Sequence, residues 1–144
     1  MVRLQMSSQK TVNDLISHGC VKQKSLILQP PKEIPEEFLP HFIRGLFDGD
    51  GCITSSLKGS YESYQVDITS TFLMVNWIKE KVGMGLIVKD SRREKTYYYT
   101  LGGNQQVIKF YHYLYNNATI YLNRKYNKFQ QLLNKYDKSR GSNV

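Results

Sequence analysis

Two aspartates separated by a glycine, Asp48 and Asp50, are the residues in this sequence best placed to do chemistry. They follow an apolar stretch whose spacing predicts a short helix from about Pro40 to Asp48. The helix macrodipole disfavours negative charge at a C-terminus, so this placement needs a compensating positive charge. Mg²⁺ would supply it, because this ion takes oxygen ligands and commonly only one or two carboxylates. Asp-Gly turns also occur without any metal, and a helix end followed by a tight turn stays the alternative.

The predicted helix also carries a face suited to close packing. Gly45 and Gly49 lie four residues apart on one side, where the missing side chains let a second backbone approach. Phe42 and Leu46 fall beside them in the helical pattern. Two such helices in contact would bring one carboxylate from each to the same point, which a divalent cation could bridge. We therefore expect two helices to pair through Phe42, Gly45, Leu46 and Gly49. Gly49 and Gly51 are further expected to reverse the chain around Asp50.

The elements that must position this helix follow from apolar periodicity and turn residues along the chain. Upstream, the pattern predicts three short elements: a strand at 2–6, a helix at 9–18 and a strand at 26–28. Downstream, it predicts two strand pairs that alternate with helices: strands at 52–57 and 61–69, a helix at 72–82, strands at 85–88 and 97–101, a helix from 104, and a last helix at 124–136. Each strand pair indicates a hairpin.

The helix at 72–82 shows how capping residues and an apolar stripe refine these boundaries. Ser70 or Thr71 would cap its N-terminus, and Gly83 would end it at the C′ position. The apolar stripe predicts that five residues face inward: Phe72, Val75, Trp77, Ile78 and Val82. We therefore expect a core helix here.

Composition and charge bound the function. The chain has 144 residues, enough for one domain with a sizeable core, and its 20 Lys and Arg against 12 Asp and Glu give a net charge of +8. This charge indicates nucleic acid rather than a membrane as partner, because no basic amphipathic helix stands apart from the core pattern; a generically basic protein is the alternative. The two cysteines have no metal-binding spacing, and no stretch resembles a signal peptide or a membrane span. We expect a soluble, intracellular protein.

The run from Ile43 to Gly51 reads IRGLFDGDG and resembles the nine-residue signature of the LAGLIDADG homing endonucleases. Both glycines, both aspartates and the final glycine are in place. The resemblance covers roughly 34–133, and the predicted order matches the α-β-β-α-β-β-α order of one module. It implies an α+β fold with an antiparallel, saddle-shaped sheet and helices on one face. We expect a module at 34–136, a flexible tail at 137–144, and at 1–33 the remnant of a preceding module.

The resemblance implies a site-specific, Mg²⁺-dependent endonuclease that cuts double-stranded DNA as a homodimer of single-motif subunits. The target would be long and near-palindromic, and the host a mobile intron or intein in a bacterium, a phage-infected cell or an organelle. An intron RNA maturase and a non-cleaving DNA-binding protein of the same fold are the alternatives.

The resemblance also assigns roles to residues. Asp50, with Gly49, would bind the metal ion. Lys125 would stabilise the pentavalent transition state, with Arg124 as the fallback, since a positive charge near the scissile phosphate favours charge that develops there. Ser70 would help to position the attacking water. The plain alternatives are a solvated lysine on a helix and an N-cap serine.

The two hairpins are the expected DNA-reading surface. Alternate residues of a strand share one face, so polar side chains on the first hairpin can line one side: Thr54, Ser56 and Lys58 on one strand, and Ser63, Gln65 and Asp67 on the other. Serine, glutamine and lysine side chains can read base edges in the major groove. Basic residues at the second hairpin would grip phosphates: Lys89, Arg92, Arg93 and Lys95. Charged tips are also common in solvated loops.

Overall fold

The computed structural model describes residue 5 and residues 7–20 and 27–141. The expected strand at 2–6 lies outside the described residues except for Gln5, and so does Leu26 of the expected strand at 26–28. Ile27 and Leu28 are described and belong to no strand. The first helix is α1 (Gln9–Ser17), which Ser8 caps by accepting a hydrogen bond from the Thr11 N–H at 3.3 Å.

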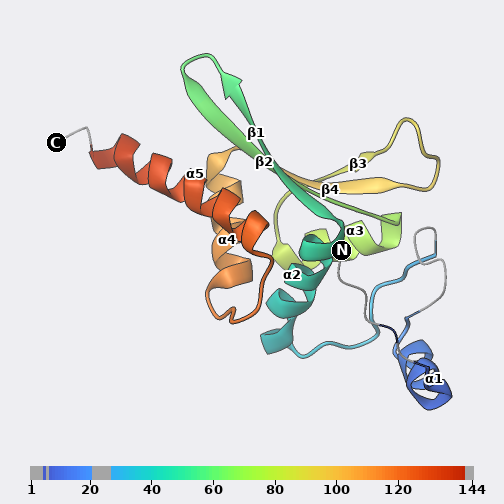
Figure 1. Ribbon diagram of the computed structural model, residues 1–144. Helices are drawn as coiled ribbons and strands as arrows, with labels where there is room; N and C mark the ends of the chain where they lie inside the picture. Colours follow the sequence, from blue (N-terminus) through green and yellow to red (C-terminus); the bar gives the residue numbers. More distant parts are fainter. Residues whose placement is uncertain (1–4, 6, 21–26, 142–144) are drawn as a thin grey trace.

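Downstream of residue 35 the elements follow the expected order. They are η2 (Glu36–Phe38), α2 (Leu39–Asp50), β1 (Gly51–Lys58), β2 (Tyr61–Ser70), α3 (Phe72–Val82), β3 (Leu86–Lys89), β4 (Tyr97–Gly102), α4 (Asn104–Tyr115) and α5 (Asn123–Gly141). The strands form an antiparallel sheet in the order β1-β2-β4-β3. The two hairpins diverge, and α2 to α5 lie on one side of the sheet (Figure 1). The predicted α+β architecture is confirmed.

The junction between α2 and β1 differs from the expected chain reversal. Gly49 is still helical, and Gly51 begins β1 in an extended conformation, with φ of −91°. Strand therefore follows helix without a turn. This direct junction demands a glycine, because a Cβ at Gly51 would lie 2.6 Å from the carbonyl oxygen of Phe47 and closer still to its ring.

The hydrophobic core lies between the sheet and the four helices. Its fully buried residues come from every one of these elements: Ile43 and Phe47 from α2, Val66 and Ile68 from β2, Val75 and Ile78 from α3, Tyr99 and Leu101 from β4, Val107 and Phe110 from α4, and Phe129 from α5. The Phe47 ring meets those of Phe110 and Phe129 at centroid distances of 6.0 and 5.7 Å. The inner face of α2 is thus central to the core.

Thr71, not Ser70, caps α3. The Thr71 hydroxyl accepts a hydrogen bond from the Met74 N–H at 3.3 Å and donates one to the Leu28 carbonyl at 2.6 Å. With the helix set in this way, the inward positions are 71, 74, 75 and 78, which follow helical spacing. Phe72 falls on the neighbouring side and is 48% exposed, so the prediction that it belongs to the core stripe is wrong.

The two terminal helices extend away from this body. Helix α1 lies apart from the rest in Figure 1 and contributes no buried residue. Helix α5 runs to Gly141, beyond the predicted end at Tyr136, and so takes in part of the expected tail. No helix in the described ranges combines the length and apolar character needed to cross a bilayer.

Candidate functional site

The two signature aspartates have different surroundings at the end of α2. Asp48 is half-buried, and its Oδ2 accepts a hydrogen bond from the Leu122 N–H at 3.1 Å. Its Oδ1 is buried and meets no hydrogen-bond partner in the described part of the chain. Asp50 is exposed. Asp48 therefore holds the segment before α5 against α2, while Asp50 lies at the solvent-facing end of the helix.

Lys125 supplies positive charge at this helix end. Its side chain is only 2% exposed, and Nζ donates hydrogen bonds to the carbonyl oxygens of Phe47, Asp48 and Gly51, the second at 3.0 Å. Nζ also lies 4.7 Å from the centroid of the Phe47 ring. Burial lowers the pKa of Lys125, and nearby Arg124 acts in the same direction, whereas Asp48 and Asp50 oppose the shift. The Lys125 ammonium group thus caps the C-terminus of α2 and supplies part of the positive charge that the sequence predicts there.

Arg44 is a residue of this site that the sequence analysis did not single out. It lies within the signature and is 8% exposed. Its Nε donates to the Ile120 carbonyl and its Nη1 to the Leu114 carbonyl, both at 2.9 Å. Together with Asp48 and Lys125, it ties the connection between α4 and α5 to α2. The sequence does hint at this role of Arg44, because a charged residue stands directly beside the core position Ile43.

The opposite side of α2 is open. A Cβ added at Gly45 or Gly49 would have no heavy atom within 4 Å beyond the helix's own backbone and the adjacent residues. Phe42 and Leu46 beside them are half-buried. Phe42 is partly covered by Trp77 of α3, whose ring meets it edge-on at 5.7 Å. The face expected to pair with a second helix is therefore accessible within one chain.

Ser70 and Arg124 lie near this helix end. Gly51 pairs with Ile68, and Ser70 follows two residues later at the end of β2, so it shares the sheet end at which α2 meets β1. Arg124 is exposed in the first turn of α5, next to Lys125. The structure thus brings Lys125 into contact with the Asp48 carbonyl in the last turn of α2 and places Ser70 and Arg124 in the neighbourhood.

The strand register defines the sheet face turned away from the helices, which we call the outer face. Thr54 pairs with Gln65 and Ser56 with Ser63, so each pair shares this face. Further positions follow from the other registers: Cys52 and Lys58 on β1, Tyr61, Asp67 and Thr69 on β2, Tyr98, Thr100 and Gly102 on β4, and Leu86 and Val88 on β3. Lys89 pairs with Tyr97 in the alternate register, and so belongs with the helix-facing positions.

Asp67 organises the centre of the outer face. Its Oδ1 accepts a hydrogen bond from the Thr100 hydroxyl at 2.7 Å. The Gln65 Nε2 donates to the same carboxylate, 2.9 Å from Oδ2 and 3.2 Å from Oδ1. Asp67 thus orients the side-chain amide of Gln65 on this face.

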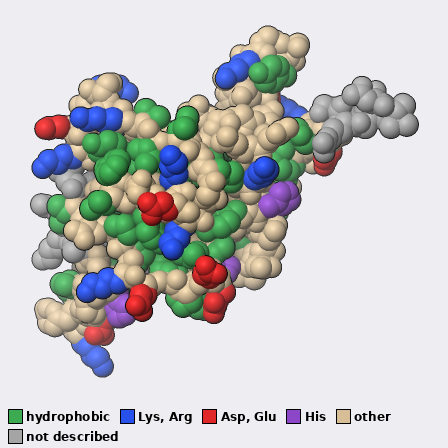
Figure 2. Space-filling model, turned by 180° about the vertical axis from the view of Figure 1, so that it is seen from behind, with side chains coloured by type: hydrophobic (Ala, Val, Ile, Leu, Met, Phe, Trp, Pro, Cys, Tyr) green, Lys and Arg blue, Asp and Glu red, His purple; other side chains and the backbone are tan. Residues whose placement is uncertain are grey.

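A second carboxylate braces the tip of the other hairpin. Asp90 is 5% exposed and accepts hydrogen bonds from the Tyr98 hydroxyl at 2.7 Å, the Arg92 N–H at 2.8 Å and Arg93 Nε at 2.9 Å. These bonds, led by the one from Tyr98, lower the pKa of Asp90 to about 2. Arg93 is thereby partly engaged inside the hairpin, and Lys95 is exposed nearby. Figure 2 shows Lys and Arg side chains gathered over this hairpin end, at the upper left.

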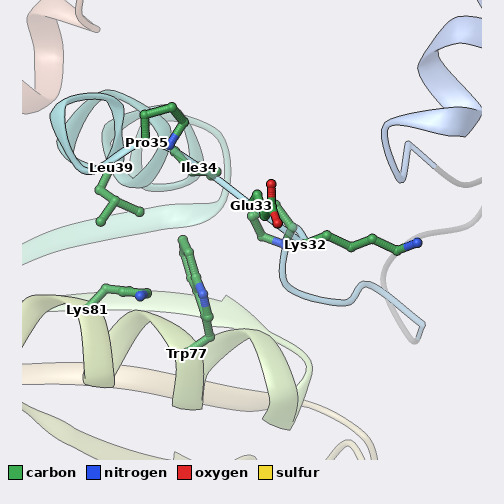
Figure 3. A pocket seen from close by; sticks show the side chains of 8 residues that line it. Lys32, Glu33, Ile34, Pro35, Leu39, Trp77 and Lys81 are labelled. Atoms are coloured by element: carbon green, nitrogen blue, oxygen red, sulfur yellow. The ribbon is translucent and has the colours of Figure 1, made fainter.

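A cavity of about 460 Å³ lies at the other end of α2. It is lined by the segment 31–35 together with Leu39, Trp77 and Lys81. In Figure 3 the Trp77 side chain rises from α3 toward Leu39, while Lys32 points away. The cavity adjoins the first residue of α2, whereas the aspartates stand at its last turn, so it is not part of the acidic site.

Within the described residues, no three His, Cys, Asp or Glu side chains are grouped so that they could hold an ion. The oxygen donors at the end of α2 nevertheless suit Mg²⁺, which usually completes its shell with water and phosphate oxygens. The buried Asp48 Oδ1 without a hydrogen-bond partner is consistent with an additional cation nearby.

No family model matches the sequence, and no curated protein does. Several solved structures do match the fold of this chain. The archaeal intron-encoded homing endonuclease I-Vdi141I, complexed with DNA, has a TM-score of 0.61 at 22% identity, over 72% of each chain. The LAGLIDADG homing endonuclease I-SmaMI, bound to cleaved DNA, has a TM-score of 0.56 at 22% identity, over 95% of this chain and 46% of its own. I-CvuI, solved with its target in Ca²⁺, has a TM-score of 0.58 at 16% identity, over 69% of this chain and 66% of its own.

These similarities define the fold of the LAGLIDADG homing endonucleases, and the resemblance inferred from the signature is confirmed at the level of the fold. The chain spans less than half the length of I-SmaMI and about two thirds of I-CvuI.

Proposed function

We propose that this chain is one subunit of a site-specific, divalent-metal-dependent endonuclease that cuts double-stranded DNA. The observation that carries the proposal is the geometry of α2. This helix ends in Asp48 and Asp50 where the first strand of the sheet begins, and its Gly45 and Gly49 side is open to a second helix. Pairing two chains through that side would place the carboxylates of both beside one duplex.

The charge and the outer face support DNA as the substrate. A net charge of +8 favours a polyanion. The outer face carries the polar side chains of Thr54, Ser56, Gln65 and Thr100, which suit base edges in a major groove. I-Vdi141I and I-SmaMI, which have the same fold, were solved with DNA.

Asp50 and the Gly49 carbonyl are the groups that would hold Mg²⁺. The ion would polarise the scissile phosphate and lower the pKa of a bound water, which is the chemistry that phosphodiester hydrolysis requires. The protein's own part is to hold in place the helix end that carries these oxygens. Lys125 does so by binding three carbonyls of the helix end, and Asp48 does so by binding the Leu122 N–H. I-CvuI, which has the same fold, was solved with its target in the presence of Ca²⁺.

The test is a selection followed by cleavage. We would select binding sites from a random duplex library in Ca²⁺, and then add Mg²⁺ to the selected duplexes. A homodimer with one twofold axis should recover a near-palindrome and cut both strands. Asp50→Asn should abolish cleavage and leave binding equal or tighter, because it removes a negative charge that faces phosphate. Cleavage by Asp50→Asn at the wild-type rate would exclude the assigned role.

A non-cleaving DNA-binding protein of the same fold is the second candidate, and Lys125 is the observation that favours it. An ammonium group has three N–H donors, and all three are used on backbone carbonyls. In that case the selected duplexes would remain intact in Mg²⁺. Tight binding to a structured intron RNA, with no duplex recovered, would instead indicate a maturase.

A further inference from the structure

We propose that Asp67 fixes the side-chain amide of Gln65 so that its oxygen reads an exocyclic amino group, that of adenine or cytosine, in the major groove. Gln65 and Asp67 both lie on β2, and Thr100 on β4 completes the network. These are the two central strands of the sheet (Figure 1). The inference rests on the proposed binding of duplex DNA and specifies what one side chain recognises there.

The carboxylate decides which way the amide of Gln65 points. An ionised aspartate only accepts hydrogen bonds, so it must face the Nε2 end of the amide and would repel the Oε1 end. The distances agree, since Nε2 lies 2.9 and 3.2 Å from the two oxygens of Asp67. The Thr100 hydroxyl holds the carboxylate itself in place at 2.7 Å. The amide is therefore preorganised, because turning it over would break these bonds and set Oε1 against a negative charge.

The amide then presents an acceptor outward. Gln65 is exposed, and its Oε1 accepts no hydrogen bond from any described residue. In the major groove, adenine N6 and cytosine N4 are donors, whereas guanine O6, thymine O4 and the purine N7 atoms are acceptors. A fixed Oε1 matches an amino group and opposes a keto group at the same place.

The position of Asp67 argues for such a role. It is the acidic residue among the outer-face positions of the four strands, on a surface proposed to face DNA. A carboxylate there reduces non-specific attraction to DNA. Its hydrogen bonds to Gln65 and Thr100 offset that loss, because they make Asp67 a positioning residue for the Gln65 amide.

The experiment compares base preferences of the wild-type protein with those of Gln65→Ala, Asp67→Ala and the double variant. Every base pair of the selected duplex is replaced in turn, and binding is measured in Ca²⁺. Gln65→Ala identifies the position that Gln65 reads, where the wild-type protein should favour an amino-bearing base on the order of tenfold. Asp67→Ala should relax the preference at that position only. The double variant should be no more relaxed than Gln65→Ala, because Asp67 acts through Gln65.

Thr100→Val is the milder variant, and Thr119→Val, the same change at an exposed position outside the sheet, is the matched control. The former removes one donor to Asp67 and should weaken the preference partially, whereas the latter leaves the hydrogen bonds of Asp67 intact. Duplex binding with no amino preference at the Gln65 position would overturn the inference, as would an Asp67→Ala change that is uniform across all sequences. Absence of any duplex binding, with the wild-type protein folded, would overturn it together with the proposed function.

Discussion

The two sides of α2 present contrasting surfaces. On the inner side, Ile43 and Phe47 are 0% exposed and pack in the core. On the outer side, Gly45 and Gly49 leave room for a second backbone. One stretch of nine residues therefore serves two interfaces, one within the chain and one proposed between chains.

The two interfaces use different forces. The inner side combines apolar burial with polar contacts to the region 114–125. Arg44 and Asp48 bind backbone groups of that region, and Lys125 of α5 binds carbonyls at the end of α2. The outer side has no side chains at its two glycines, and so offers backbone proximity rather than buried area. The inner side should therefore govern the stability of the chain, and the outer side its association.

Phe47→Ala should have the largest effect on the chain. It removes a fully buried ring that contacts Phe110 and Phe129, and we expect a loss of about 3–5 kcal/mol in the free energy of unfolding. Leu46→Ala, on the outer side, should cost less than half as much in the dissociated chain. Urea denaturation at low protein concentration measures the free energy of unfolding of both variants. Equal losses would contradict the proposal that the inner side governs stability.

Arg44→Met should have the next largest effect on the free energy of unfolding. The substitution keeps an unbranched stem but removes the guanidinium group, which leaves the Leu114 and Ile120 carbonyls without their donor, at a cost of about 1–3 kcal/mol. Lys128→Met, at an exposed position of α5, is the control and should stay within about 0.5 kcal/mol of the wild-type protein. Thermal unfolding followed by circular dichroism would compare them. A neutral Arg44→Met would show that the polar contacts do not hold the inner side.

The sequence predicts the elements of this fold well, because their signals are local. Helical spacing, strand alternation and turn residues each act within a few positions, and the two hairpins and their flanking helices appear in the predicted order. Phe72 marks the limit of that reasoning. An apolar residue at the start of a helix can face either side, and its direction depends on which residue caps the helix, here Thr71.

The hydrogen bonds of the site join residues far apart in the sequence, so local patterns do not predict them. Lys125 is 74–78 residues from the carbonyls that it binds, and Arg44 is 70–76 residues from its own. The macrodipole of α2 predicts a positive charge at its C-terminus, and from the sequence we expected a metal ion alone to supply it. Only the packing of α5 against α2 shows that Lys125 provides part of it, and that its ammonium group is buried there.

Gly49→Leu tests the outer side. The side chain would enter open space in the single chain, so folding should be retained, but it would stand between two paired helices. We expect the wild-type protein to be a dimer at micromolar concentration and the variant to associate at least tenfold more weakly. Light scattering measures the mass of each. A monomeric wild-type protein would contradict the pairing through α2, and with it the assembly proposed for cleavage.

Gly45→Ala is expected to have the smallest effect, and it should act in opposite directions on folding and on association. Alanine is favoured over glycine in a helix interior by roughly 0.5–1 kcal/mol, and the added methyl group would meet nothing within 4 Å in the single chain. The free energy of unfolding should therefore rise by that amount when measured at concentrations where the protein is dissociated. At higher concentration the same methyl group would hold the paired helices apart, so the gain should shrink or reverse, and the dependence of stability on concentration should weaken. A variant that is more stable than the wild-type protein by the same margin at every concentration would show that this side of α2 contacts solvent and not a second helix.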